Sequence, residues 1–353
     1  MATNTENYNL VKPDENDYYD IEIQNDNMDK IDAELKKAQD HRGSTSNPHK
    51  VMADQVGAIN PNLLINGDFR INQRGKYIYD SPGYTFDRWL LSFDESKVGP
   101  TVKRGESTSD YGSGGYYAHV VLSSVSNEDN GGFNFLEKLD LTSSERKVLR
   151  SKTVTFSAWC HTSADYMRLY LAYLTNDGEL VASFTGIPQY SANRYSVSID
   201  IPYDAKQLEF GVACSRSLTA NDVGTAIDIA ECKLEIGSVA TEFSPRPYAE
   251  ELEMCKKYYR RIIAKGLCSS LNLNALLVAL NPSMRTFPTI VSVESPVTHT
   301  ANTADEYGIG EVPFENPSIS YGTDEYITFI STTSTLNAGS QYSVLLTLDA
   351  EIY

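Results

Sequence analysis

The chain has 353 residues, of which 41% are hydrophobic and 22% are charged, and its formal net charge is −17. An acidic surface repels phosphate backbones, so the charge argues against nucleic acid as a partner. The apolar content is sufficient for folded cores, and no apolar run approaches the roughly 18 residues of a membrane span, so we expect no membrane insertion.

Residues 1–42 are polar, and their start lacks the basic and apolar stretches of a secretory signal. A helix is predicted over Asp14–Gln39, because Pro13 precedes it and Asp14 with Asp17 resembles a capping pair. Apolar residues at heptad spacing, with Gln24 in one slot, form a seam at Ile21, Met28, Ile31, Leu35 and Ala38. The seam is typical of a short parallel coiled coil, and one amphipathic helix packed on another domain is the alternative.

Residues 43–60 follow as a linker rich in Gly, Ser, Asn and Pro. Residues 61–244 show many short alternating runs, which predict an antiparallel β-sandwich of jelly-roll type. In one run Val154, Phe156 and Ala158 share a face and Trp159 lies on the other. The Asn176-Asp177-Gly178 sequence predicts a turn between two such strands.

Residues 245–264 predict a second helix. Its apolar stripe has spacings of 4, 3, 4 and 3 and contains Tyr248, Leu252, Cys255, Tyr259 and Ile262. Acidic residues lie early and basic residues late, which complements a helix dipole. Residues 265–353 predict a second, smaller β-sandwich. Its last strand alternates clearly between Tyr342 and Ile352, whereas Ala301–Asn316 is expected to be an acidic loop.

Several segments, in matching order, resemble parts of phage tail fibres, which contractile bacteriocins also use. They are Asn47–Val51 and Gln55–Gly57, Asn62–Phe69 (NLLINGDF) with Asn72–Gly75 (NQRG), Tyr84–Trp89 (YTFDRW), Lys233–Thr241, Phe243–Tyr248 and Met284–Thr289. In that family the segments from residue 62 onward are similar to a carbohydrate-binding-module-like sandwich, and those from residue 284 onward to a C-terminal head. The resemblance covers nearly the whole chain.

The resemblance implies a mainly β protein with an N-terminal helical stalk and two β-sandwich domains joined by a helix, assembled as a parallel homotrimer. It implies a receptor-binding fibre that attaches a phage or bacteriocin tail to a bacterial surface glycan. The N-terminus would bind baseplate proteins. The chain would be made in the bacterial cytoplasm and act, within the particle, outside the target cell. Three linked copies would give weak sugar sites avidity.

Aromatic side chains are the candidates for glycan contact, because sugars stack on ring faces. The candidates in the first sandwich are Trp89, Trp159, Tyr116, Tyr117, Tyr166 and Tyr170, and packing in a core is the alternative for each. In the head, Tyr307, Tyr321 and Tyr326 flank predicted loops and are the better receptor candidates.

No cofactor is expected, and two metal sites are weighed. Copies of His41 and His49 in the linker would form a ring of imidazoles on a trimer axis, and a turn histidine is the alternative. Asp68, Asp228 and Glu231 would supply a structural calcium site, although Arg70 weakens that reading.

No catalytic function is expected, because the chain lacks the HExxH, GxSxG, GxGxxG and phosphate-loop patterns. A polysaccharide-degrading tail spike and a purely structural tail protein remain the alternatives. Five dispersed cysteines without a CxxC pair predict small core residues rather than disulfides or zinc ligands.

Overall fold

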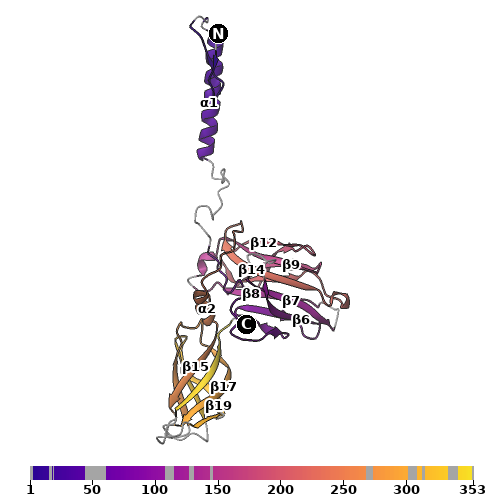
Figure 1. Cartoon of the computed structure of the whole chain (residues 1–353), viewed down its shortest axis with the longest axis vertical. Helices are drawn as coiled ribbons and strands as arrows, with labels where there is room; N and C mark the ends of the chain where they lie inside the picture. The colour runs from indigo at the N-terminus through magenta and orange to yellow at the C-terminus, as the bar shows by residue number, and fades with distance from the viewer. Residues whose placement is uncertain are drawn as a thin grey trace. The chain divides into compact units, whose positions relative to one another are not determined.

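A computed structural model of the chain describes residues 3–15, 18, 20–43, 61–107, 115–126, 131–143, 146–267, 273–300, 308–311, 315–332 and 341–351. The chain divides into two compact units, Met1–Ile59 and Asn60–Tyr353 (Figure 1). The mainly β architecture expected from the sequence is confirmed in the second unit. Within the described residues, no helix has the length and apolar character needed to cross a bilayer.

The first unit contains a short hairpin and one helix. Strands β1 (Thr3–Asn4) and β2 (Val11–Lys12) pair in antiparallel fashion, and α1 spans Ile21–Gly43. The amide of Asn27 in α1 bonds both backbone groups of Val11, at 2.8 and 2.9 Å, so the hairpin is held against the helix. The sequence did not predict this hairpin.

The predicted start of the helix at Asp14 is wrong. The described residues between Lys12 and Ile21 are not helical, and Asp20 caps the helix instead: its Oδ1 accepts a 2.9 Å bond from the Glu22 backbone N–H. The helix also continues past the predicted end at Gln39 and finishes at Gly43, a residue type that favours helix ends. The described seam residues Ile21, Met28, Ile31, Leu35 and Ala38 are all exposed within this unit.

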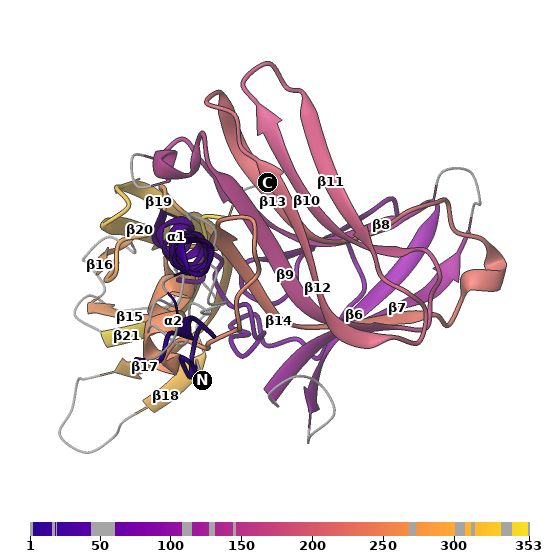
Figure 2. The same ribbon diagram turned by 90° about the horizontal axis from the view of Figure 1, so that it is seen from above.

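The second unit begins with a sandwich of two six-stranded antiparallel sheets. The first sheet contains, in spatial order, β11 (Leu180–Gly186), β10 (Met167–Thr175), β13 (Ala205–Cys214), β8 (Phe133–Asp140), β5 (Trp89–Phe93) and β4 (Gly83–Tyr84). The second contains β12 (Ala192–Asp200), β9 (Thr153–Thr162), β14 (Ala226–Ile236), β7 (Gly115–Val125), β6 (Val98–Ser107) and β3 (Ile78–Tyr79). Figure 2 shows β10, β11 and β13 side by side. Short 3₁₀ helices cover Lys147–Leu149 and Ala220–Asp222.

The core lies between the inner faces of these sheets. The predicted inward residues of β9, Val154, Phe156 and Ala158, are fully buried, so that alternation is confirmed. The predicted turn at Gly178 is also present, with φ +87° and a 3.2 Å bond from its N–H to the Thr175 carbonyl. Phe156 packs on Phe210 with ring centroids 5.4 Å apart, which joins the two sheets across the core.

The segment after residue 61 extends the second sheet beside β14. The Leu63 N–H donates to the Leu234 carbonyl at 2.8 Å, and the Cys232 N–H donates to the Gly67 carbonyl at 2.8 Å. A Cβ on Gly67 would lie 2.2 Å from the Cys232 oxygen, so this approach requires glycine.

Asn66, with φ +60°, is the centre of the same segment. Its side chain bonds both backbone groups of Ile71 and the Asp87 carbonyl, at 2.9–3.0 Å. Its own carbonyl accepts the indole N–H of Trp89 at 3.0 Å. The tail-fibre-like segments around residues 66 and 87 therefore form one buried hydrogen-bonded unit.

The predicted helix over residues 245–264 is confirmed only in its first part, where α2 covers Tyr248–Lys256. The second part of the predicted helix is wrong, because Tyr259–Leu267 forms strand β15. The β-branched pair Ile262 and Ile263 favours a strand, and pairing with β21 overrides the helical periodicity. The Arg260 guanidinium bonds the Lys256 carbonyl at 3.3 Å, which satisfies one of the carbonyls left at the helix end.

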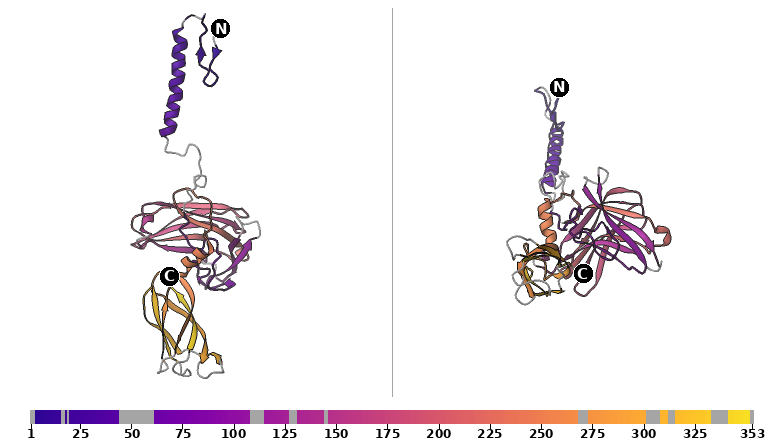
Figure 3. Two further views of the ribbon diagram at one scale, coloured as in Figure 1. Left: turned by 60° about the vertical axis from the view of Figure 1, so that its left-hand side comes forward. Right: turned by 60° about the horizontal axis from the view of Figure 1, so that its bottom comes forward.

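The head consists of two sheets, one of four strands and one of three (Figure 3). The first contains β15, β21 (Gln341–Asp349), β17 (Thr289–Thr300) and β18 (Gly308–Glu311), and the second contains β16 (Leu273–Ala279), β20 (Tyr326–Thr332) and β19 (Glu315–Gly322). The predicted last strand is confirmed as β21, with Leu346 and Leu348 fully buried. Strand β18 lies inside the stretch that the sequence predicted to be a loop.

A buried ion cluster joins the head to the sandwich. Arg88 pairs with Glu351 and lies 3.3 Å from Glu137. Arg74 lies 3.3 Å from Asp349 and 3.7 Å from Glu351. Asp349 ends the last strand of the head and Glu351 follows it, so the two arginines hold the end of this strand against the sandwich.

Aromatic rings complete this joint. The guanidinium carbon of Arg88 lies 3.8 Å from the ring centroid of Tyr258, and that of Arg74 lies 3.9 Å from that of Tyr259. Burial raises the pKa of Glu137 to about 8, and burial also raises the pKa of Glu351. Burial and the neighbouring Glu351 favour the protonated form of Glu137, whereas the Arg88 guanidinium favours its charged form.

Candidate functional site

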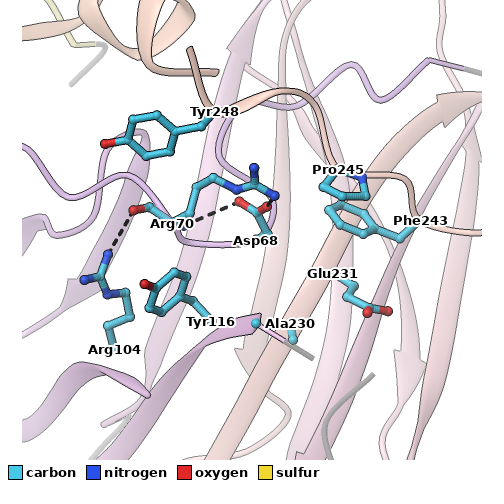
Figure 4. Close-up of a pocket in the computed structure, with 10 residues that line it drawn as sticks. Asp68, Arg70, Arg104, Tyr116, Ala230, Glu231, Phe243, Pro245 and Tyr248 are labelled. Carbon is cyan, nitrogen blue, oxygen red and sulfur yellow. Dashed lines mark hydrogen bonds and ion pairs between the residues drawn. The ribbon is translucent and has the colours of Figure 1, made fainter. Parts of the chain in front are cut away.

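A surface cavity of about 480 Å³ lies where the end of the second sheet meets the segment before α2. We call it the Tyr248 pocket. Its lining residues come from the chain after Asn66, from β6, β7 and β14, and from the 243–248 segment. They are Asp68, Arg70, Arg104, Gly115, Tyr116, Ala230, Glu231, Phe243, Pro245 and Tyr248 (Figure 4).

A chain of polar contacts fixes one side of this pocket. Arg70 forms an ion pair with Asp68, and its Nη1 donates to the Arg246 carbonyl at 3.0 Å. Arg104 Nη1 donates to the Arg70 carbonyl at 2.9 Å. Both members of the Asp68–Arg70 pair keep part of their side chains exposed, so the pair presents donors and acceptors to the cavity.

Glu231 reaches the pocket through an irregularity in β14. The pairing of β14 with β9 shifts between Ala230 and Lys233, and Glu231 has φ +50°. Arg194 supports the bulge, because its Nη1 donates to the Glu231 carbonyl at 3.1 Å and lies 3.7 Å from the Glu231 carboxylate. The bulge turns an acidic side chain into the cavity that regular alternation would direct elsewhere.

Three aromatic rings border the polar groups. Tyr248 is 57% exposed, Phe243 and Tyr116 are half-buried, and the guanidinium carbon of Arg104 lies 4.3 Å from the Tyr116 ring centroid. In Figure 4, Tyr248 and Tyr116 lie on opposite sides of the Arg70 backbone, and Phe243 lies beyond Asp68. Ring faces beside charged hydrogen-bonding groups suit a ligand that has both apolar C–H faces and hydroxyl groups.

Most of the aromatic residues predicted as contacts lie elsewhere. The prediction that Trp89 contacts a glycan is wrong, because Trp89 is fully buried. Its ring packs between those of Phe69 and Phe135, with ring centroids 4.8 and 5.1 Å away. Trp159 lies on the outer face of β9 but keeps only 9% of its surface exposed, which leaves little ring area for a ligand.

Most of the remaining candidate tyrosines of the first sandwich are also packed against other parts of the protein. Tyr166 and Tyr170 are buried, and Tyr117 covers Gly105, where an added Cβ would lie 2.2 Å from the ring. In the head, Tyr326 is half-buried at the start of β20. Tyr307 and the side chain of Tyr321 lie outside the described residues. Among the predicted aromatic contacts whose side chains the structure describes, only Tyr116 lines the pocket.

In the described part of the chain, no group of three or more His, Cys, Asp or Glu side chains is placed to hold a metal ion. Asp68 and Glu231 line the Tyr248 pocket, whereas Asp228 contacts His119 at 2.5 Å and His161 at 3.5 Å on neighbouring strands. The calcium trio is therefore not brought together. His41 is exposed in the last turn of α1, and His49 lies outside the described residues.

Sequence reasoning missed Phe243 and Arg104 and assigned Tyr248 to a helix stripe. It did single out Asp68, Arg70 and Glu231, but as metal ligands or their neighbours. A signal existed in the Ser-Pro-Arg-Pro run before Tyr248, because two prolines fix an extended approach to the helix and leave its first residue exposed.

No family model matches the chain, and no curated protein matches it. Among solved structures, the enzymatically active domain of tailspike protein 4 from bacteriophage CBA120 shares 17% identity over 50% of this chain, with a TM-score of 0.36; the match spans 21% of the tailspike chain. The carbohydrate-binding module TmCBM61, solved with β-1,4-galactotriose, shares 15% identity over 50% of this chain and 99% of its own, with a TM-score of 0.32.

A cyclase from Fischerella sp. TAU shares 14% identity over 52% of this chain and 100% of its own, with a TM-score of 0.34. Sugar binding and enzymatic activity in these cases are properties of those proteins. For this chain, function has to be derived from its own site.

Proposed function

We propose that this chain is a glycan-binding receptor-binding protein of a tail fibre, which attaches a phage or phage-tail-like particle to a bacterial surface. The observation that carries the proposal is the Tyr248 pocket, where three aromatic rings border the ion pair of Asp68 and Arg70 and the carboxylate of Glu231. Sugar rings stack on aromatic faces, and their hydroxyl groups bond to charged planar side chains.

The pocket favours binding over catalysis. Its two carboxylates, Asp68 and Glu231, are what a glycoside hydrolase would need, but Asp68 is held in an ion pair with Arg70. The ion pair occupies acceptor sites of the Asp68 carboxylate that a nucleophile or a base would need for attack by or on water. Incubation with host cell-wall polysaccharide should therefore release no reducing sugar, whereas sustained release would favour a degrading tail spike.

The tail-fibre part of the proposal is supported by the ordered sequence segments and by α1. The apolar seam of α1 stays exposed within its unit, at Ile21, Met28, Ile31, Leu35 and Ala38. A 23-residue helix with this seam is stabilised when copies of itself cover the apolar side chains. We propose a homotrimer along this helix, with the N-terminal hairpin facing baseplate proteins, as part of the tail of the assembled particle.

The decisive experiment compares two tyrosine variants of the full chain. Tyr248→Ala removes an exposed ring from the pocket, and Tyr203→Ala removes a 79% exposed ring that lies outside it. Binding of fluorescent protein to host cells and to their purified surface glycan should fall at least about tenfold for Tyr248→Ala and stay unchanged for Tyr203→Ala. Equal binding by both variants would remove the pocket from the mechanism.

A further inference from the structure

A second cavity, of about 490 Å³, adjoins the Tyr248 pocket, and we call it the Lys76 pocket. The two cavities share four lining residues, which are Arg70, Arg104, Tyr116 and Tyr248. The second is further lined by Asn72, Gly75, Lys76, Tyr77, Gly105 and Glu106. A ligand longer than one sugar unit can therefore extend from the first cavity into the second past a common wall.

The turn that carries Lys76 and Tyr77 is fixed by its own hydrogen bonds. Gly75 has φ +70°, and its N–H donates to the Asn72 carbonyl at 3.2 Å. The Asn72 side chain donates to the Lys76 carbonyl at 3.1 Å and accepts from the Tyr79 hydroxyl at 2.5 Å. Lys76 and the 75% exposed Tyr77 thus belong to a rigid turn, which lowers the entropic cost of binding.

Arg104 is held between the two cavities. One nitrogen donates to the Arg70 carbonyl, and the guanidinium lies over the Tyr116 ring. Within the described residues, its other nitrogens make no hydrogen bond, and neither Arg104 nor Lys76 pairs with a carboxylate. By contrast, Arg70 is neutralised by Asp68. Arg104 is therefore an oriented cation whose remaining donors suit a planar or tetrahedral oxyanion.

The charge of the Lys76 pocket differs from that of the chain as a whole. The chain carries a net charge of −17, whereas this cavity combines Lys76 and Arg104 with one carboxylate, that of Glu106. Screening over about 8 Å at physiological salt limits the influence of distant acidic residues. An anionic group can therefore be attracted locally even though the protein repels polyanions in general.

We propose that the Lys76 pocket binds the carboxylate or phosphate group of an acidic glycan, whose neighbouring sugar lies in the Tyr248 pocket. This inference rests on the proposed glycan-binding function and narrows its ligand to an anionic polysaccharide. Two sources supply the same chemistry: a uronic acid within the chain of sugars and a phosphodiester between its units.

The test measures binding of three probes to the full chain by isothermal titration calorimetry. α-1,4-Trigalacturonate and neutral α-1,4-galactotriose differ in the groups at C6, and an oligomer of glycerol phosphate supplies the phosphodiester. We expect one of the two anionic probes to bind about three- to tenfold more tightly than galactotriose at low salt. The anionic probe with this preference identifies the source of the charge. The preference should shrink at about 0.5 M NaCl, where screening is stronger.

Two lysine variants separate local contact from overall charge. Lys76→Ala removes the cation from the cavity, and Lys103→Ala removes an exposed lysine of β6 that lines neither cavity. We expect Lys76→Ala to abolish the anionic preference with galactotriose binding unchanged, and Lys103→Ala to retain it. Both lysines are exposed, so both variants should fold.

Three results would overturn the inference. If galactotriose binds as tightly as both anionic probes, and Tyr248→Ala weakens all three, glycan binding stands and the anionic subsite falls. If Lys76→Ala and Lys103→Ala lose the preference for the anionic probe equally, the overall charge of the protein explains the preference, and the Lys76 pocket is not an anionic subsite. If no probe binds and Tyr248→Ala leaves attachment to host cells intact, both proposals fall.

Discussion

At the scale of single residues, the ionisation of Glu137 is coupled to folding. It is fully buried beside Arg88, and burial raises its pKa from 4.5 to about 8. The folded state therefore holds the proton more tightly than the unfolded state. That contribution to stability is fully present below about pH 4.5 and is lost as the pH rises through about 8.

As the pH rises from about 4.5 to about 8, we expect the melting temperature of the wild type to fall more than that of Glu137→Gln. The reason is that the glutamine side chain stays neutral throughout this range. Differential scanning calorimetry at several pH values measures this. Asp222 does not confuse the result, because Arg216 holds its pKa at about 2 and its effect appears only in acid. Parallel curves for the two proteins would show that Glu137 is already ionised in the folded state.

Gly67 offers a second test at this scale. An added Cβ would lie 2.2 Å from the backbone oxygen of Cys232, so Gly67→Ala must displace the chain beside β14. We expect a loss of about 2 kcal/mol or more in the free energy of unfolding, measured with urea. Gly186→Ala is the matched control, because an added Cβ there meets nothing within 4 Å, and it should change stability little.

At the scale of elements, the second helix shows why the fold could be predicted only in part. The stripe from Tyr248 to Ile262 fits a helix, yet the chain becomes strand β15 after Lys257. The reason lies about 75–90 residues later in β21, whose nine residues pair with β15. Local periodicity cannot report a distant partner, whereas β21 itself was predicted because its own alternation is strong.

The site was less predictable than the strands for a related reason. Glu231 enters the pocket through a bulge, Phe243 through the irregular segment ahead of α2, and Tyr248 from the first position of α2. No alternation rule places such side chains. Trp89 illustrates the opposite case: its bond to the Asn66 carbonyl satisfies its one polar atom, so the ring can be fully buried.

The joint between sandwich and head gives a prediction about whole elements. Arg88→Met leaves Glu137 and Glu351 buried without their shared cation, so we expect a loss of about 3–5 kcal/mol. The head should then be released more quickly by limited proteolysis. Arg168→Met is the control, because Arg168 contacts the partly exposed Phe184 ring at 3.6 Å instead of a buried acid. Equal proteolysis of both variants would show that other contacts hold the head.

At the scale of the whole molecule, the trimer is testable without disturbing the sandwich. Ile31→Ser with Leu35→Ser removes two seam residues of α1, and Lys30→Ser with Asp29→Ser changes the same helix outside the seam. Light scattering should give about three times 39.2 kDa for the wild type and for the control pair. The seam variant should be a monomer with an unchanged sandwich melting transition. A wild-type monomer at micromolar concentration would refute the assembly.

The antiparallel segment beside β14 has a mechanical consequence. In the proposed tail fibre, a particle attached to a cell would pull on the polypeptide ahead of Asn62, and that force would first reach the bonds of Asn62 and Leu63 to Cys232 and Leu234. Asn62→Ala removes the side-chain hydrogen bonds of Asn62 to Cys232 and Leu234. We therefore expect the variant to rupture at a lower force than the wild type in single-molecule stretching. An unchanged rupture force would place the weakest link elsewhere. In the proposed fibre these few hydrogen bonds would break first under load, before the hydrophobic interior of the sandwich is exposed.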